Sequence, residues 1–139
     1  MKLVVILLLC TIKGTCFSQN LGWDKTVNWK LYDVHDQKAF LYSLDTLQYF
    51  KSIGLDKDKM QMFLQNVTII QKDNEPVWMG FYVATCKLQD GTFVKIDISM
   101  YGGFFYDEKT KTYYQLPSNL KDDWFNYLTE KGTVLQSTN

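Results

Sequence analysis

Residues 77–101 read VWMGFYVATCKLQDGTFVKIDISMY, and this stretch decides the fold. Two long runs rich in β-branched and aromatic residues, 77–88 and 93–101, flank the tetrapeptide Gln89-Asp90-Gly91-Thr92. Asp-Gly supplies the positive φ angles that a two-residue type I′ turn needs. The stretch therefore predicts a long antiparallel β-hairpin.

A two-residue turn fixes which side chains share a face of this hairpin. Val83 then lies opposite Ile98 on an apolar face. The other face carries Tyr82, Cys86, Lys95, Asp97, Ser99 and Tyr101. A loop longer by one residue would instead bury Ala84 and Cys86, because register decides which way each side chain faces.

The hairpin lies inside a longer β-rich region. After Gly102-Gly103, residues 104–106 and 112–116 predict a second hairpin, and residues 29–34 and 67–70 predict strands earlier in the chain. Consecutive hairpins form an antiparallel meander. We expect a four- to five-stranded antiparallel meander sheet.

Helical patterns flank the strands. Ser43 as an N-cap and Gly54 as a C-cap predict a helix over 43–54, and Asp56 can cap a second, short helix. Leu55 and Met60 stand at the positions of a hydrophobic staple for that second helix. The helical patterns place the N-terminal helices before the sheet.

A C-terminal helix follows the sheet. We expect it to begin at Ser118 or Asn119, to end at Gly132 and to cover the sheet, with residues 133–139 as a frayed polar tail. The fold class is therefore α+β: N-terminal helices, a meander sheet and a C-terminal covering helix. One layer of helices leaves the other sheet face at least partly wet.

The N-terminus has the form of a secretory signal. Lys2 precedes the apolar run 3–12, and small residues lead to a cleavage point between Ser18 and Gln19. The run is too short for a membrane span, which needs about 20 apolar residues. We predict a signal peptide over 1–18 and a single secreted or periplasmic α+β domain over 19–139, without a transmembrane span in the mature chain.

The end of the leader, Phe17-Ser18-Gln19-Asn20, resembles secretory signals of Bacteroidota, and the resemblance covers the leader alone. A lipoprotein anchored through Cys10 or Cys16 is the competing interpretation. The residues before both cysteines fit a lipobox poorly. Cleavage after Ser18 is therefore the favoured interpretation.

Composition excludes several functions. All 15 basic residues are lysine, and the mature region is mildly acidic. Recognition of nucleic acids relies on arginine and a basic face, so we expect no nucleic-acid partner. His35 is the only histidine, and Cys86 is the only cysteine after the leader. We therefore expect no zinc site, no other metal and no cofactor.

Catalytic groups have little support in the pattern. Cys86 would share a hairpin face with Lys95 and Asp97, which permits an activated thiol, but no base is placed beside it. The remaining candidates are three carboxylate pairs, Asp73/Glu75, Asp107/Glu108 and Asp122/Asp123, and turn or cap roles explain them. The sequence predicts a non-enzymatic protein.

Aromatic side chains make a binding surface the leading hypothesis. Tyrosine and tryptophan can lie half-buried with a wet polar tip, and both are enriched in recognition surfaces. The candidate surface on the sheet consists of Trp78, Tyr82, Lys95, Asp97, Tyr101, Tyr106 and Tyr113. We expect a module, of the inhibitor or immunity type, that binds a protein or an envelope polymer. The alternatives are a carrier with an apolar pocket between sheet and helices, and a small hydrolase using Cys86 or paired carboxylates.

Overall fold

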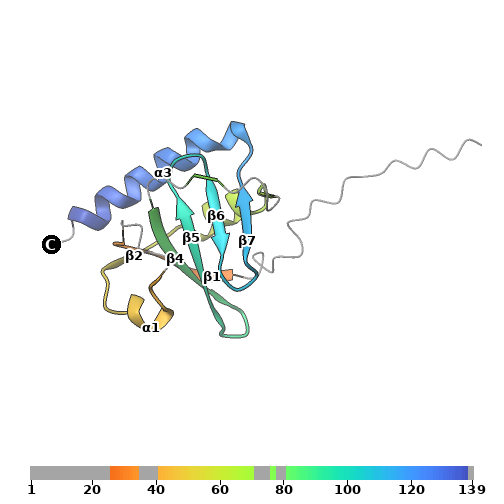
Figure 1. The fold of residues 1–139 in the computed structure, drawn as a ribbon. Coiled ribbons are helices and arrows are strands. Elements are labelled where there is room, and N and C mark those ends of the chain that lie inside the picture. Colours follow the sequence, from red (N-terminus) through yellow and green to blue (C-terminus); the bar gives the residue numbers. More distant parts are fainter. Residues whose placement is uncertain (1–25, 35–40, 71–75, 78–80, 138–139) are drawn as a thin grey trace, which may run out of the picture.

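The computed structural model describes residues 26–34, 41–70, 76–77 and 81–137 (Figure 1). The strands are β1 (Thr26–Tyr32), β2 (Ser52–Gly54), β3 (Thr68–Ile69), β4 (Phe81–Leu88), β5 (Phe93–Ser99), β6 (Phe104–Asp107) and β7 (Thr112–Gln115). The helices are α1 (Leu44–Leu47), α2 (Lys57–Leu64) and α3 (Ser118–Ser137). The fold is α+β with an antiparallel sheet, as the sequence predicts.

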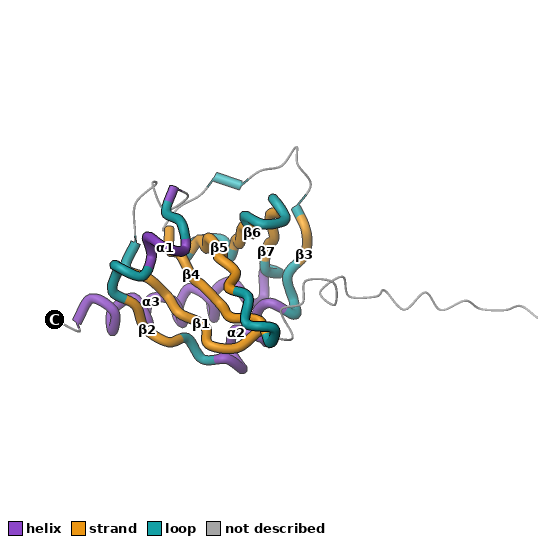
Figure 2. Tube along the Cα trace, turned by 90° about the horizontal axis from the view of Figure 1, so that it is seen from below, coloured by secondary structure: helices purple, strands orange, loops and turns teal. Residues whose placement is uncertain are grey.

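The sheet has seven strands in the order β2-β1-β4-β5-β6-β7-β3, and every neighbouring pair is antiparallel. Strands β4 to β7 form the expected meander. The expected four to five strands are too few, because β2 and β3 add a short strand at each edge. Figure 2 shows α1 on one side of the sheet and α2 and α3 on the other.

The loop of the β4–β5 hairpin has three residues, Gln89, Asp90 and Gly91. The Leu88 amide donates to the Thr92 carbonyl at 2.7 Å, and Gly91 has a φ of 89°. This is the geometry of a three-residue loop with a glycine in the left-handed region, which Asp-Gly fits as well as a type I′ turn. The expected two-residue turn is wrong, and so is the facing of β4 derived from it. The expected division of β5 into an apolar and a polar side is confirmed.

The corrected register turns the β4 side chains over. Val83 pairs with Asp97, and Cys86 pairs with Val94. Tyr82, Ala84 and Cys86 consequently share the α3 side with the apolar residues Val94, Ile96 and Ile98 of β5. The polar residues of β5 share the opposite face with Val83 and Thr85.

A continuous apolar core fills the space between the sheet and the two longer helices. Trp124 of α3 is fully buried, and its ring centroid lies 5.1 Å from that of Phe63 on α2 and 4.8 Å from that of Phe105 on β6. Its Nε1 donates to the Ser99 carbonyl at 3.0 Å. This one side chain joins α2, α3 and the sheet.

The predicted helix over 43–54 is wrong beyond its first turn. Ser43 caps α1 as expected by accepting from the Thr46 amide, but α1 ends at Leu47. Residues 52–54 form β2 instead, where Ile53 pairs with Leu31 of β1. Pairing with a neighbouring strand has overridden a local helical pattern, as tertiary contacts often do.

The signals for the second helix are confirmed. The Asp56 carboxylate accepts from the Lys59 amide at 2.8 Å at the start of α2. Leu55 and Met60, the two staple residues, are both buried. Local capping chemistry therefore defines this N-terminus.

Helix α3 passes through Gly132 and continues to Ser137, so the expected stop at Gly132 and the frayed tail after it are wrong. A Cβ at position 132 would lie 2.5 Å from the Tyr82 hydroxyl oxygen. The glycine permits a close approach of helix to sheet rather than ending the helix.

Several expectations concern residues outside the described part of the chain. These are the signal peptide over 1–18 with its cleavage site, His35, Trp78 and the pair Asp73/Glu75. Among the described residues, no helix combines the length and apolarity needed to cross a membrane.

Candidate functional site

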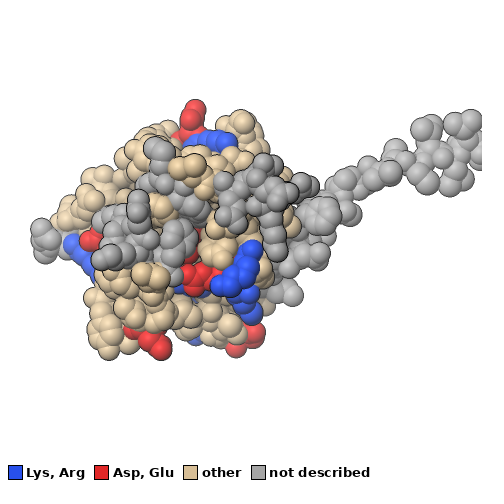
Figure 3. All heavy atoms as spheres, viewed as in Figure 1, with Lys and Arg blue, Asp and Glu red and all other residues tan. Residues whose placement is uncertain are grey.

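The sheet face opposite α2 and α3, called the open face below, carries the polar side chains of β5. Lys95, Asp97 and Ser99 alternate with the core residues Ile96 and Ile98, and all five are buried. Figure 3 views the molecule from this side and shows acidic and basic side chains close together near its middle. A buried charged group costs free energy unless it is paired, so this face needs a specific explanation.

Three side chains form a charged cluster on the open face: Lys95, Asp97 and Glu108. The Lys95 Nζ lies 3.4 Å from Asp97 Oδ1 and donates to Glu108 Oε1 at 2.5 Å. The Glu108 side chain is 32% exposed, whereas the Asp97 side chain is 1% exposed. Lys95 therefore joins a solvated carboxylate to a buried one.

Asp97 is the least satisfied member of the charged cluster. Neither of its carboxylate oxygens accepts a hydrogen bond within the described part of the chain, although the Lys95 ammonium lies beside it. Burial raises the pKa of Asp97 to about 7, and the Glu108 carboxylate adds to the rise while Lys95 opposes it. The Asp97 carboxyl thus titrates near neutral pH.

An open cleft of about 450 Å³ lies on the same face, between α1 and the strands. Six of its lining residues carry polar end groups: Lys30, Tyr32, Asp45, Gln48, Ser52 and Thr85. Three are apolar: Leu44, Phe50 and Phe93. We call this hollow the sheet-face cleft.

The floor of the sheet-face cleft belongs to the inner strands. The Tyr32 hydroxyl of β1 lies 3.2 Å from the Thr85 hydroxyl of β4, and both residues are buried. Thr85 in turn pairs with Lys95 across β4 and β5. The cleft floor and the charged cluster are therefore neighbours on one surface.

Helix α1 forms one wall of the cleft, and packing holds it there. Leu47 is fully buried against Tyr32 and Val83, with Phe50 packed beside them. Asp45 and Gln48, on the exposed side of α1, line the cleft above this small apolar cluster. A single helical turn thereby supplies both an anchor and polar groups.

Four of the predicted surface residues lie together on the open face. Lys95 and Asp97 belong to the charged cluster, and Asp97 pairs with Tyr106 across β5 and β6. The Tyr106 and Tyr113 rings are in contact, with centroids 4.5 Å apart. Both tyrosines are partly exposed at this end of the face.

The other predicted surface residues do not join them. Tyr82 is buried on the α3 side, which corrects its placement beside Lys95. Tyr101 is 48% exposed, and its ring lies 5.4 Å from that of Phe125 on α3. Trp78 lies outside the described residues. The structure thus divides the predicted surface between the two faces.

Cys86 is buried on the helix-covered face, away from Lys95 and Asp97. Burial raises the pKa of its thiol to about 12, with the Asp107 carboxylate adding to the rise. A thiol with this pKa is protonated at neutral pH, so it lacks the thiolate that a nucleophile needs.

Sequence reasoning missed the cleft residues, and it named Glu108 only as a partner of Asp107, without its contact with Lys95. In β1, Lys30 and Tyr32 alternate with the core residues Trp29 and Leu31, which was a readable sign that they share a face. The contribution of Glu108 had no such sign, because it depends on how β6 lies beside β5. The cleft itself depends on the position of α1.

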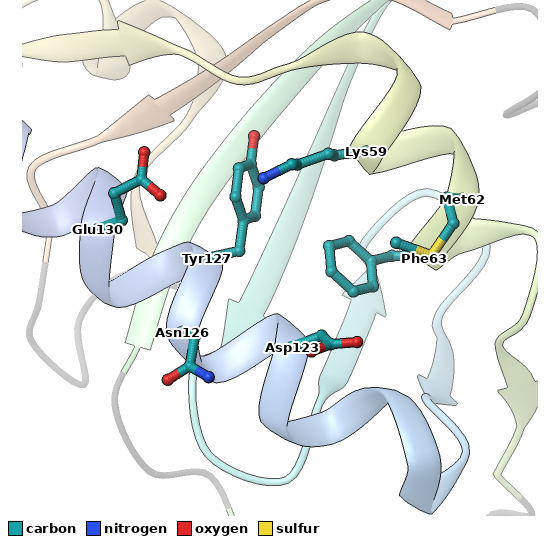
Figure 4. Close-up of a pocket in the computed structure, with 7 residues that line it drawn as sticks. All are labelled: Lys59, Met62, Phe63, Asp123, Asn126, Tyr127 and Glu130. Atoms are coloured by element: carbon teal, nitrogen blue, oxygen red, sulfur yellow. The ribbon is translucent and has the colours of Figure 1, made fainter.

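A second hollow of about 330 Å³ lies between α2 and α3 (Figure 4). The Lys59 Nζ lies 5.0 Å from the centroid of the Tyr127 ring, and the Tyr127 hydroxyl accepts from the Asp56 amide at 2.8 Å. Phe63 reaches between the helices toward the core. These contacts attach α2 to α3, which is a structural role.

Within the described residues, no group of three His, Cys, Asp or Glu side chains is placed to hold a metal ion. Comparison of the chain with protein families, with curated proteins and with solved structures gives no match. The open face, with its charged cluster and cleft, is the part of the described molecule whose chemistry bears on function.

Proposed function

We propose that this chain is a secreted or periplasmic, non-enzymatic binding protein that holds its partner, a protein or an envelope polymer, on the open face. The observation that carries the proposal is the sheet-face cleft, in which polar groups from α1, β1, β2 and β4 converge beside the charged cluster. Concave sites with a few convergent polar groups are where proteins most often bind ligands.

The contrast with the opposite face supports this location. There, apolar side chains from α2, α3 and the sheet fill the space, with Trp124 and Leu128 fully buried. This packing gives little support to a carrier with an apolar pocket between sheet and helices. The open face instead has exposed groups at the cleft, among them Lys30, Asp45 and Phe93.

A hydrolytic function has weaker support. Asp97 has the raised pKa of a general acid, and Glu108 is close to the same lysine, as in a carboxylate pair with divided roles. However, Asp97 is fully buried, and a catalytic acid must reach the reacting atom of its substrate. Cys86 is protonated and faces away. Binding is the function that this geometry supports best.

The experiment compares capture of partners from the envelope fraction by the wild-type protein and by a variant with a filled cleft. Gln48→Trp places a large ring at the exposed wall of α1 and should abolish capture of the specific partner. Gln136→Trp, at an exposed position near the end of α3, is the matched control and should capture as the wild type does. Capture that survives in Gln48→Trp would exclude the cleft as the binding site.

A further inference from the structure

We infer that the sheet-face cleft binds a neutral saccharide, such as a segment of an uncharged envelope polysaccharide. This inference rests on the proposed function and names the chemical class of its ligand.

The charges at the cleft are balanced. Its polar lining contains one cation, Lys30, and one anion, Asp45, and both are exposed. An anionic polymer would be attracted by a surplus of lysine or arginine, and a cationic peptide by a surplus of carboxylates. Neither surplus exists among the lining residues that the structure describes, and this balance suits a ligand without net charge.

The remaining polar groups suit a ligand with many hydroxyls. Ser52 offers a hydroxyl that both donates and accepts, and the Gln48 amide also does both. The Tyr32 and Thr85 hydroxyls of the floor are buried and bond to each other, which leaves this pair one hydroxyl proton and further lone pairs for a ligand. A saccharide hydroxyl also donates and accepts, so each contact can form in either direction. A purely apolar ligand would remove Ser52 and Gln48 from water without replacing their hydrogen bonds, which costs free energy.

The backbone of the cleft floor is not available to a peptide strand. Strand β1 is paired with β2 and β4, and β4 is paired with β1 and β5. Binding of an extended peptide by strand addition needs an unpaired edge. Strand addition at the floor is therefore excluded, and the edge strand β2, which contributes Ser52, has only three residues to offer a peptide. This favours a ligand that is recognised by side chains, such as a saccharide.

Phe93 supplies the apolar surface that a sugar ring needs. Its side chain is 53% exposed at the cleft, and the Lys87 Nζ lies 5.6 Å from the ring centroid. One face of a pyranose consists of C–H groups, which pack on an aromatic ring while the hydroxyls around its rim contact polar groups. An exposed phenylalanine in a cleft that also carries the Ser52 hydroxyl and the Gln48 amide provides both parts of this contact.

The test is a titration of ¹⁵N-labelled full-length mature protein with neutral hexasaccharides: cello-, laminari-, malto-, manno- and chitohexaose. At least one should shift the amide signals of cleft residues, and Phe93→Ala should weaken its binding at least about tenfold, or roughly 1.4 kcal/mol. Tyr101→Ala removes an aromatic ring of similar exposure far from the cleft and should leave the affinity unchanged. An oligogalacturonate, which carries a carboxylate on every ring, should not bind.

Three outcomes overturn the inference: no neutral hexasaccharide binds, only the oligogalacturonate binds, or Phe93→Ala and Tyr101→Ala behave alike. The envelope capture experiment separates this failure from failure of the proposed function. If Gln48→Trp abolishes capture but no hexasaccharide binds or competes, the cleft is a binding site for another class of ligand. If capture is unaffected by Gln48→Trp, the proposed function itself fails.

Discussion

The two faces of the sheet are made by alternate residues of the same strands, yet they have different chemistry. On β5, Ile96 and Ile98 pack toward α3, while Lys95 and Asp97 lie on the open face. The helix-covered face is an apolar core, whereas the open face combines a charged cluster with a polar cleft. Adjacent residues of a strand face opposite sides of the sheet, so a shift of one residue in register would exchange the side chains of the core with those of the open face.

The largest expected effect concerns the helix-covered face. Trp124→Ala should lower the free energy of unfolding by about 3–5 kcal/mol, because it leaves a cavity among α2, α3 and the sheet. Phe50→Ala, at a partly buried side chain packed against the small apolar cluster under α1, should cost less, about 1 kcal/mol. Urea denaturation followed by circular dichroism measures both variants. Equal losses would show that the open face contributes as much packing as the covered one.

The next effect concerns the charged cluster. Lys95→Met removes the ammonium beside a buried carboxylate and should destabilise the protein by about 3 kcal/mol at pH 8. The double variant Lys95→Met/Asp97→Leu should regain most of that loss, because no unpaired buried charge remains and Glu108 can be solvated. A single variant as stable as the wild type would contradict the burial of Asp97.

Titration of Asp97 should change the free energy of unfolding by a smaller amount for each pH unit. The Asp97 pKa is about 7 in the folded protein, against an ordinary value of 3.8, so the folded state binds the proton more tightly. The stability associated with this proton is fully present below about pH 4 and is lost as the pH rises toward 7. The free energy of unfolding should fall by up to about 1.4 kcal/mol per pH unit in that interval.

Asp97→Asn keeps the shape of the protonated carboxyl and should remove this contribution to the pH dependence. Denaturation of both proteins at several pH values between 4 and 8 measures the difference. If the two stability profiles run parallel, Asp97 does not titrate in this interval.

The smallest effect is expected at the cleft. Phe93→Ala should change stability by no more than about 0.5 kcal/mol, because the side chain is half exposed and lies outside both apolar clusters. Thermal denaturation measures this change beside the loss of binding described above. A large loss of stability would assign Phe93 to packing and weaken the contrast between the faces.

Local signals predicted the elements that local chemistry controls. The Asp56 cap and the Leu55–Met60 pair identified the start of α2, and the hairpins identified the meander from β4 to β7. At Gly132 the local signal led to a wrong prediction, the end of α3. A glycine near the end of a helical pattern is typical of a C-cap, but here it makes room for the Tyr82 hydroxyl from the sheet.

The sheet face on which a side chain lies, and the position of a cleft, depend on tertiary contacts that the sequence does not reveal. Asp90-Gly91 fits both a two- and a three-residue loop, and the choice moved Tyr82 and Cys86 to the other face. Lys95 and Asp97 could be predicted as neighbours because they are two apart on one strand. Glu108 joined them through the register in which β6 pairs with β5, and the meander pattern predicts this pairing but not its register.

The sheet ends in very short strands, three residues in β2 and two in β3. Long edge strands offer a row of free amide and carbonyl groups on which a second molecule can grow a cross-β assembly. Edges of two or three residues provide too few such groups to template fibril growth. Concentrated solutions of the folded protein should therefore be slow to seed amyloid.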